Sequence, residues 1–314
     1  MSTVSARPAP SSARSPAASR RARARTPGPA AGAAARPPDA LDGARLVPAV
    51  ERAVRLLDAL AAARQPQSLA ALARALALPR SSVHGLLATL VALGLARRNG
   101  DAEFSLGPKA LQWADAYGSR TDVLRAFDAQ VDRFAELGTE TVMLATLDGA
   151  DVVYLACRQG SRPLAVNFRV GGRFPAACTS SGKAMLAALP DATVRERLGA
   201  GPLPRLTRHG LPSVAALLRQ LDGVRRQGIA VDDEETAEGM QCFGAAIRGP
   251  RGDEATAAVA VSVIKAGLGA RRRTELVDAI RRLSDAIAVE LGAAPERAGP
   301  HAVTSRRHDP PPRA

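Results

Sequence analysis

The hydrophobic pattern changes its period part-way along the chain, and this change constrains the fold more than any other feature. Between Pro48 and Leu90, apolar residues recur every three or four positions, which is the period of amphipathic helices. From Thr141 onwards, apolar and polar residues alternate, which is typical of strands. A chain of 314 residues is long enough for two domains. We therefore expect a helical N-terminal domain and a C-terminal domain built around a sheet.

Positive charge is concentrated in the two ends of the chain. Of the formal net charge of +13, residues 1–45 carry +6 and residues 293–314 carry +2, so the middle is only mildly basic. Both ends are poor in branched apolar side chains, which predicts disorder. A basic arm that adds contacts to DNA phosphates is one interpretation of residues 1–45. Compositional bias, or a start codon placed too early, is the interpretation that we favour.

Composition excludes several classes of protein. The longest run without Asp, Glu, Lys or Arg has sixteen residues, 81–96, whereas a membrane helix needs about 20 apolar residues. The three cysteines lie far apart and form no C-x-x-C pair, which argues against a zinc finger and a disulfide framework. The pair Arg20-Arg21 is followed by no apolar export segment. We expect a cytoplasmic protein with no membrane contact, no metal site and no cofactor.

Three short helices are predicted between Pro48 and Ala92. The first has a stripe of apolar residues opposite a charged face with an i,i+4 Glu51/Arg55 pair. Ser68 is placed to cap the second helix, and Pro79 suits the first turn of the third. The residues expected to be buried are Val50, Val54, Leu57 and Leu60, then Leu69, Leu72 and Leu76, then Val83, Leu86, Leu87 and Leu90.

The outer face of the third helix is small and free of acidic residues. Ser81, Gly85, Ala88 and Ala92 point away from its apolar stripe, with Ser82 and His84 beside them and Arg80 in the first turn. Short side chains allow a helix to approach base edges in a major groove, while hydroxyls and Arg80 can hold phosphates. The alternative is an ordinary solvated face, but such faces usually carry Glu and Lys. We interpret this helix as a recognition helix.

A hairpin is predicted directly after these helices. Asn99-Gly100 separates the runs 95–98 and 101–107, and Asn-Gly favours a type I′ turn in which both central residues have positive φ. Three helices followed by a hairpin form a winged helix-turn-helix. Arg97 and Arg98, at the root of the hairpin, are placed to contact the DNA backbone, whereas Asp101 and Glu103 disfavour such contact at the tip.

Residues 51–107 resemble the DNA-binding half of the IclR-type transcriptional regulators. The resemblance is carried by ERAVRLLDALAAA, SLAALARALALPRSSVHGLLATLVALGLARR and EFSLGPKAL. Two positions depart from the family pattern: Gly85 stands where Arg is common, and Ala77 stands where Gly often closes the second helix. The residues expected to contact DNA are Arg80, Ser81, Ser82, His84, Arg97 and Arg98.

The rest of the chain predicts a linker helix and an α+β domain with a mainly antiparallel sheet. Residues 108–118 should form the linker helix, in which Trp113 either packs on the second domain or meets another subunit. A helix over 121–137, ended by Gly138, should follow. The expected strands are 141–147, 151–158, 164–168, 229–232, 241–248 and 256–264, and the further helices are 179–189, 191–198, 213–227 and 273–291.

Polar residues gather where a helix should begin near Thr179. The segment 178–183 reads C-T-S-S-G-K and supplies hydroxyls and amides to a small anion, or else is only a capped helix start. Ser180 and Lys183 also spell S-x-x-K, the nucleophile pair of a hydrolase, without the partner motifs. The acids at 232–235 are expected to form a solvated turn rather than a metal site, with Asp232 alone pointing inward, and Cys242 is expected to be a small buried residue.

The second half also resembles the IclR-type regulators, in their GAF-like effector-binding domain. The matching segments are GGRFPAACTSSGKAMLAALP, GPLPRLTRHGLPS and VRRQGIAVDDEETAEGMQCFGAAIRGPRG. The resemblance implies a pocket for a small organic acid. Ala260 and Ala177 replace residues that are often Ser and His, so the acid is expected to differ from the simplest two-carbon acids. The effector-binding residues carried over, with the hydroxyl of the neighbouring Thr179, are Thr179, Ser180, Ser181, Asp232, Cys242 and Ser262.

These observations predict a DNA-binding transcriptional regulator and not an enzyme. A small carboxylate would alter operator binding through a homodimer or homotetramer, by changing how two DNA-binding domains are spaced. The alternatives are a Ser-Lys hydrolase and a ligand-sensing module whose winged domain contacts protein. The expected organisation is a disordered basic arm (1–45), a winged helix-turn-helix domain (46–107), a linker helix (108–120), an effector-binding domain (121–292) and a disordered tail (293–314).

Overall fold

The fold is described from a computed structural model for residues 46–100, 102–119, 122–161, 168–249 and 255–293. The predicted arm lies outside this part of the chain, as does the predicted tail except for Ala293. In the described part, no single helix is long and apolar enough to span a membrane, and one bent pair of helices, Leu69–Leu76 and Arg80–Ala92, meets the length and composition criteria together.

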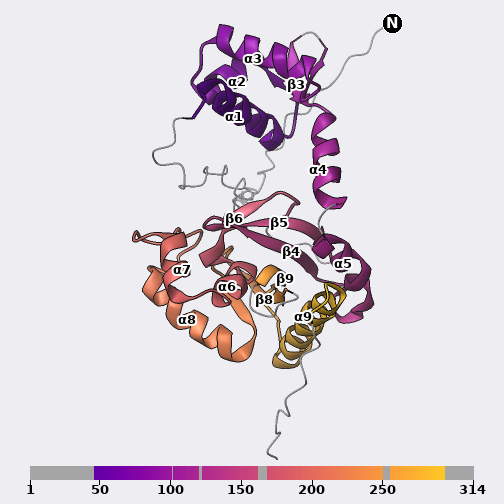
Figure 1. The fold of residues 1–314 in the computed structure, drawn as a ribbon, viewed down its shortest axis with the longest axis vertical. Helices are drawn as coiled ribbons and strands as arrows, with labels where there is room; N and C mark the ends of the chain where they lie inside the picture. The colour runs from indigo at the N-terminus through magenta and orange to yellow at the C-terminus, as the bar shows by residue number, and fades with distance from the viewer. Residues whose placement is uncertain (1–45, 101, 120–121, 162–167, 250–254, 294–314) are drawn as a thin grey trace, which may run out of the picture. The chain divides into compact units, whose positions relative to one another are not determined.

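The N-terminal part of the described chain is a winged helix-turn-helix (Figure 1). Its elements are α1 (Pro48–Ala62), β1 (Gln67–Ser68), α2 (Leu69–Leu76), α3 (Arg80–Ala92), β2 (Ala96–Asn99) and β3 (Glu103–Leu106). Ser68 caps α2 by accepting a hydrogen bond from Ala71 N at 3.2 Å, as predicted. The strands form one antiparallel sheet in the order β1-β3-β2. The core is made by Leu56, Leu60, Leu72, Leu76, Val83, Leu87, Leu90 and Phe104.

Two sequence predictions for this domain were wrong in detail. Helix α1 buries Leu56 and Leu60, whereas Val50 and Val54 are 61% and 51% exposed. Helix α1 has apolar residues on two faces, and periodicity does not say which face the core covers. The hairpin pairs Asn99 with Glu103, so three residues form its turn, and only Gly100 has positive φ there among the described residues. The turn is therefore not type I′.

The C-terminal domain is a six-stranded antiparallel sheet between two layers of helices (Figure 1). The strand order is β6-β5-β4-β9-β8-β7. The strands are β4 (Thr141–Asp148), β5 (Asp151–Arg158), β6 (Arg173–Pro175), β7 (Ala230–Asp233), β8 (Met240–Arg248) and β9 (Ala255–Ile264). The helices are α4 (Lys109–Ser119), which precedes the domain, α5 (Asp122–Gln130), α6 (Ser180–Ala187), α7 (Asp191–Leu198), α8 (Val214–Gln227) and α9 (Ala270–Glu290).

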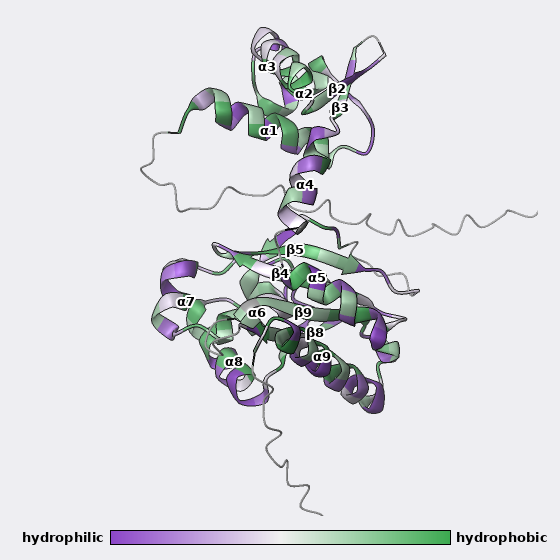
Figure 2. Cartoon of the chain, turned by 45° about the vertical axis from the view of Figure 1, so that its right-hand side comes forward, coloured by the Kyte–Doolittle hydropathy of each residue, from purple (hydrophilic) through white to green (hydrophobic). Residues whose placement is uncertain are grey.

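Alternation along the strands gives each face of the sheet its own core. Phe243, Ala245 and Ile247 of β8 face α5 and α9, whereas Met240 and Cys242 face the side of α6 and α8. The helices turn hydrophobic sides to the sheet and charged sides to the solvent (Figure 2). The sequence therefore predicted correctly an α+β domain with an antiparallel sheet.

One further prediction was wrong, and another is tested at a single residue. The helix expected over 121–137 ends at Gln130, and two 3₁₀ turns, Val131–Arg133 and Ala135–Leu137, continue it around Phe134. Most of the third strand expected over 164–168 lies outside the described residues. Phe168 is described as a buried residue outside any strand, and β5 pairs instead with β6.

Candidate functional site

The outer face of α3 is exposed, as its pattern predicted. Arg80, Ser81 and His84 are exposed, and Ser82 is half-buried. Gly85 lies in the middle of this face, and a Cβ added to it would meet no heavy atom within 4 Å. No acidic residue lies on α3 or in its first turn. The face can therefore approach an anionic surface closely without electrostatic repulsion.

The two arginines of the hairpin leave opposite faces of it. Arg97 pairs with Ser105, and Arg98 pairs with the buried Phe104. Arg98 therefore lies on the face of the hairpin that packs on the core, although the residue itself is exposed. On the outer side, Arg97 Nε donates to Asn99 Oδ1 at 3.3 Å, and Asn99 Nδ2 donates to Ser105 Oγ at 2.8 Å. This chain of hydrogen bonds orients the Arg97 guanidinium, which sequence reasoning had treated as equivalent to Arg98.

In the C-terminal domain, four polar residues form a row across one face of the sheet. Asp232 of β7 pairs with Cys242 of β8, Cys242 pairs with Ser262 of β9, and Ser262 pairs with Thr141 of β4. Directly opposite residues of antiparallel strands point to the same face. All four are at most 3% exposed, and Cys242 Sγ lies 2.9 Å from Ser262 Oγ. The strand register thus brings together three of the residues predicted to bind the effector.

The other predicted effector residues begin helix α6, which packs on the same face of the sheet. Thr179 caps the helix by accepting from Gly182 N at 3.0 Å. A Cβ on Gly244 of β8 would lie 2.6 Å from the backbone of Ser180, so glycine is required for this close approach. Ser181 is 1% exposed, and its Oγ lies near the Tyr154 hydroxyl but makes no hydrogen bond of good geometry to any described residue. A buried hydroxyl of this kind is available to a polar group of a ligand.

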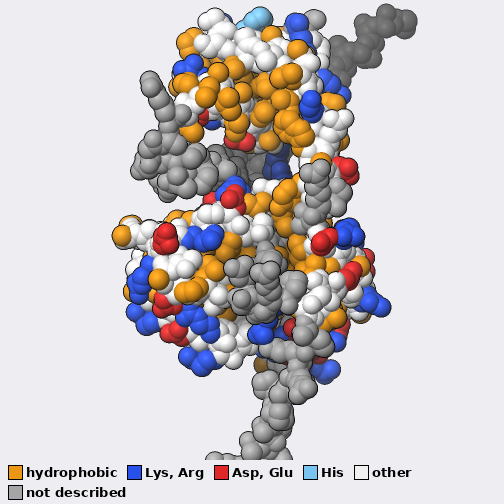
Figure 3. Space-filling model, in the orientation of Figure 1, with side chains coloured by type: hydrophobic (Ala, Val, Ile, Leu, Met, Phe, Trp, Pro, Cys, Tyr) orange, Lys and Arg blue, Asp and Glu red, His pale blue; other side chains and the backbone are white. Residues whose placement is uncertain are grey.

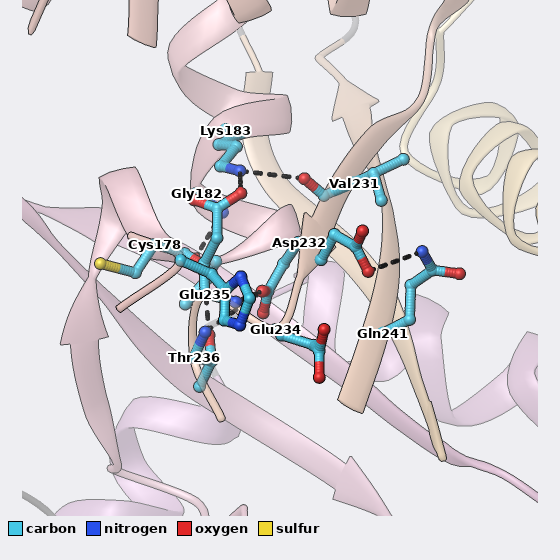
Figure 4. Close-up of polar contacts among 12 residues, drawn as sticks. Cys178, Gly182, Lys183, Val231, Asp232, Glu234, Glu235, Thr236 and Gln241 are labelled. Atoms are coloured by element: carbon cyan, nitrogen blue, oxygen red, sulfur yellow. Dashed lines mark hydrogen bonds and ion pairs between the residues drawn. The ribbon is translucent and has the colours of Figure 1, made fainter. Parts of the chain in front are cut away.

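The turn after β7 joins the polar row to α6 (Figure 4). Asp232 Oδ1 accepts from the backbone N–H of Glu235 at 2.7 Å and of Thr236 at 3.1 Å. Lys183 Nζ donates to Val231 O at 2.9 Å and forms an ion pair with Glu235. Lys183 is fully buried and Glu235 is 4% exposed. The prediction of a solvated turn was therefore wrong for Glu235, while Asp232 points inward as predicted.

Burial shifts the titration of every acid in this cluster. Burial raises the pKa of Asp232, against the hydrogen bonds from Thr236 and the charge of Lys183. Burial likewise raises the pKa of Glu235 to about 7, again against the charge of Lys183. The pKa values of Cys242 and Tyr154 are raised well above their ordinary values by burial. Near neutral pH, Cys242 and Tyr154 therefore contribute no charge, and the electrostatics depend on Asp232, Glu235 and Lys183.

The structure does not support a Ser-Lys nucleophile. The Nζ of Lys183 is engaged by Val231 O and by the Glu235 carboxylate, and no contact between Lys183 Nζ and Ser180 is found, so the amine is not placed as a base for Ser180. Within the described residues, no group of three or more His, Cys, Asp and Glu side chains is arranged to hold a metal ion.

Sequence reasoning missed three residues of this site. Tyr154 of β5 lies near the hydroxyl of Ser181, and its ring makes an edge-to-face contact with Phe168, with centroids 5.4 Å apart. Lys183 and Glu235 form the buried ion pair. The Gly182-Lys183 pair in the segment 178–183 was the only sequence feature that drew attention to Lys183. No local sequence pattern identifies Tyr154 as a residue of this site.

Comparison with known proteins agrees with both domains. Residues 49–100 match the IclR helix-turn-helix domain, and residues 115–289 match the C-terminal domain of the bacterial transcriptional regulator IclR. The chain is 33% identical to the Pca regulon regulatory protein of Pseudomonas putida over 62% of this chain and 66% of that protein. It is also 33% identical to the transcriptional regulator SauR of Cupriavidus necator, over 68% of this chain and 85% of SauR.

A solved structure shares the fold. An IclR homologue from Microbacterium hydrocarbonoxydans, complexed with 4-hydroxybenzoate, is 24% identical over 77% of this chain and 98% of that one, with a TM-score of 0.66. The family matches cover both the exposed face of α3 and the polar row of the sheet. The chain is therefore a member of the IclR family of transcriptional regulators, with a helix-turn-helix DNA-binding domain.

Proposed function

We propose that the protein binds an operator through α3 and the hairpin, and that a small carboxylate bound in the C-terminal domain changes this binding through a homo-oligomer. The observation that carries the proposal is the presence, in one chain, of an exposed, acid-free α3 face and a buried row of polar side chains next to the start of a helix. Such a regulator acts where the chromosome is, in the cytoplasm.

The contact with DNA is assigned to α3 and Arg97. Ser81 and His84 lie on the exposed face and are placed to contact base edges in a major groove, while Arg80 and Ser82, in the first turn, suit a phosphate. Arg97 is oriented by Asn99 and suits the adjacent backbone, and Arg98 adds positive charge at the same root. Arg80, Ser81, Ser82, His84, Arg97 and Arg98 thus have separate roles.

The effector is assigned to the residues where α6 packs on the polar row. The Ser181 hydroxyl makes no hydrogen bond of good geometry to a described residue, and Ser180 and Thr179 stand at the start of the same helix, where backbone dipoles favour negative charge. Asp232, Cys242 and Ser262 supply the opposite wall from the sheet. A small molecule with one carboxylate and a short body suits this set of hydroxyls and amides.

A homodimer or homotetramer is assigned to exposed apolar side chains. Val47, Val50 and Val54 of the α1 region are each more than half exposed, and hydrophobic side chains dominate the face over α1 (Figure 3). Trp113 on α4 is 55% exposed. Exposed apolar stripes of this kind are typical of subunit interfaces, and two copies would present two recognition helices to a symmetric operator.

Salt-dependent binding to the protein's own upstream DNA tests the DNA-binding surface. Replacing Arg97 and Arg98 with Ala should weaken binding and lower the slope of log affinity against log salt by about 1 to 2, because each lost phosphate contact contributes about 0.9. Arg219→Ala, which removes one exposed arginine from α8, should leave the slope unchanged. An unchanged slope in the Arg97/Arg98 variant would remove the hairpin from the interface, and no retardation of this DNA would favour a protein-contacting winged domain.

A further inference from the structure

The buried cluster beside the proposed effector site, made of Asp232, Glu235 and Lys183, has more acidic groups than basic ones. The ammonium group of Lys183 forms an ion pair with Glu235 and interacts electrostatically with Asp232, so one cation stands against two carboxyl groups; all three residues are at most 4% exposed. With every group ionised, the cluster would carry one uncompensated negative charge. A buried charge without a partner is strongly unfavourable, and a protein avoids it by protonating one of the acids.

Few hydrogen bonds are available to stabilise the negative charge of the two carboxylates. Lys183 Nζ is shared between Glu235 and Val231 O. Asp232 Oδ1 receives two backbone amides, and Glu235 Oε2 is buried without any hydrogen-bond partner in the described part of the chain. An acid oxygen in this position is more stable with a proton than with a full negative charge.

The charged groups of the same turn pair outside the cluster, Lys265 with Asp233 and Glu234 and the exposed Arg208 with Glu238, and His209 is exposed. The buried titratable groups that face the cluster supply no positive charge. Cys178 before α6, Cys242 on β8 and Tyr154 on β5 all interact electrostatically with it. Burial raises the pKa of Cys178 to about 11, and raises those of Cys242 and Tyr154 well above their ordinary values. All three are neutral at pH 7. A carboxylate effector that arrived beside Asp232 would therefore add a further negative charge to a cluster that has only one cation, Lys183, for two acids.

We propose that the C-terminal domain admits a carboxylate effector only when one proton sits on the buried Asp232–Glu235 pair, so that binding is coupled to proton uptake. The inference rests on the proposed effector site. The proton comes from the solvent and no covalent bond is changed. At a pH below the range in which the pair titrates, the proton is already present, and effector binding takes up no proton. Above it, each bound carboxylate takes up one proton, and affinity falls about tenfold per pH unit.

Infrared spectroscopy of the unliganded full chain tests the charge state without any effector. We expect the carbonyl-stretch band of a protonated, buried carboxyl group near neutral pH, with a titration at about pH 7, close to that of Glu235. The band should shift or disappear in Glu235→Gln or Asp232→Asn, both nearly isosteric, and should be unchanged in the control Glu238→Gln, whose side chain is exposed and bridges Arg208. Absence of such a band near pH 7 in the wild-type chain would overturn the proposal.

Calorimetry with 4-hydroxybenzoate tests the coupling. Titration in two buffers of different ionisation enthalpy counts the protons taken up; we expect about one per site near pH 8 and close to none near pH 5.5, with this difference abolished in Glu235→Gln. Binding without proton uptake near pH 8 would overturn the coupling and leave the proposed effector site standing. A protonated-carboxyl band together with no response of DNA binding to any carboxylate would instead contradict the proposed function.

Discussion

Ala77 occupies a backbone conformation that its side chain disfavours. It ends α2 with φ 53° and ψ 41°, in the left-handed region, where glycine is the usual residue. An L-residue other than glycine loses roughly 1 kcal/mol or more in this region. The departure noted in the sequence, Ala where Gly often closes the second helix, therefore has a definite structural cost.

Ala77→Gly should stabilise the winged domain. We expect the free energy of unfolding to rise by about 0.5–1 kcal/mol, because relief of the strained φ outweighs the added entropy of the unfolded chain. Hydrogen exchange of the α2 and α3 amides in the full chain measures the change. Ala88→Gly, an identical substitution at an exposed helical position, should have the opposite effect, and a loss of protection in Ala77→Gly would contradict this assignment of strain.

The residues of the candidate site were identified more completely than their contacts. The resemblance to the family named Asp232, Cys242 and Ser262, and the strand register aligned them in one row. The burial of Glu235 could not be foreseen, because a run of four acids is usually solvated. Its partner Lys183 lies 52 positions away in sequence, and no local pattern encodes a pairing across that separation.

At the scale of elements, the hydrophobic period predicted which segments are helices and which are strands. It did not predict which face of a helix is buried or how long a turn is. Helix α1 has two apolar faces, and only tertiary packing selects Leu56 and Leu60 over Val50 and Val54. Asn99-Gly100 correctly marked a hairpin, but strand pairing extended to Asn99 and lengthened the turn. The helix that begins at Asp122 gives way to 3₁₀ turns where Phe134 leaves helical geometry, a feature that an apolar period does not reveal.

Helix α3 contains a glycine that the fold does not require. Gly85 has no positive φ, and a Cβ there would meet nothing within 4 Å. Gly85→Ala should therefore raise the free energy of unfolding by about 0.5–1 kcal/mol, since glycine is a poor helix former. If this face meets base edges closely, the same variant should bind its upstream DNA about tenfold more weakly, a cost of about 1.4 kcal/mol.

This opposition between stability and affinity distinguishes a DNA-facing surface from a solvated one. Gly223→Ala, in helix α8 with equally open space around its Cβ, should stabilise the C-terminal domain and leave DNA affinity unchanged. A Gly85→Ala variant that is more stable and binds DNA as tightly as the wild type would place the closest contact elsewhere on the domain.

At the scale of the whole molecule, the proposed regulation acts through a homo-oligomer. If the valine stripe is its interface, replacing Val50 and Val54 with Arg should lower the mass in solution, because charged side chains on an apolar interface lose their hydration. Both positions are exposed, so folding should be retained. Light scattering measures the molar mass in solution. The affinity for DNA should fall together with this mass, because a smaller species no longer presents two recognition helices to the operator. The control Arg52→Glu changes charge at an exposed residue of α1 outside the valine stripe. Unchanged mass in the double variant would exclude this stripe as the interface.

The measurement that tests the central proposal most directly is the affinity of the full chain for its own upstream DNA, by fluorescence anisotropy, with and without small carboxylates. The proposal predicts salt-dependent binding whose affinity changes at least several-fold with one such acid, and an Asp232→Ala variant that binds the DNA but no longer responds to the acid. Binding that no carboxylate alters, or an Asp232→Ala variant that responds like the wild type, would contradict it.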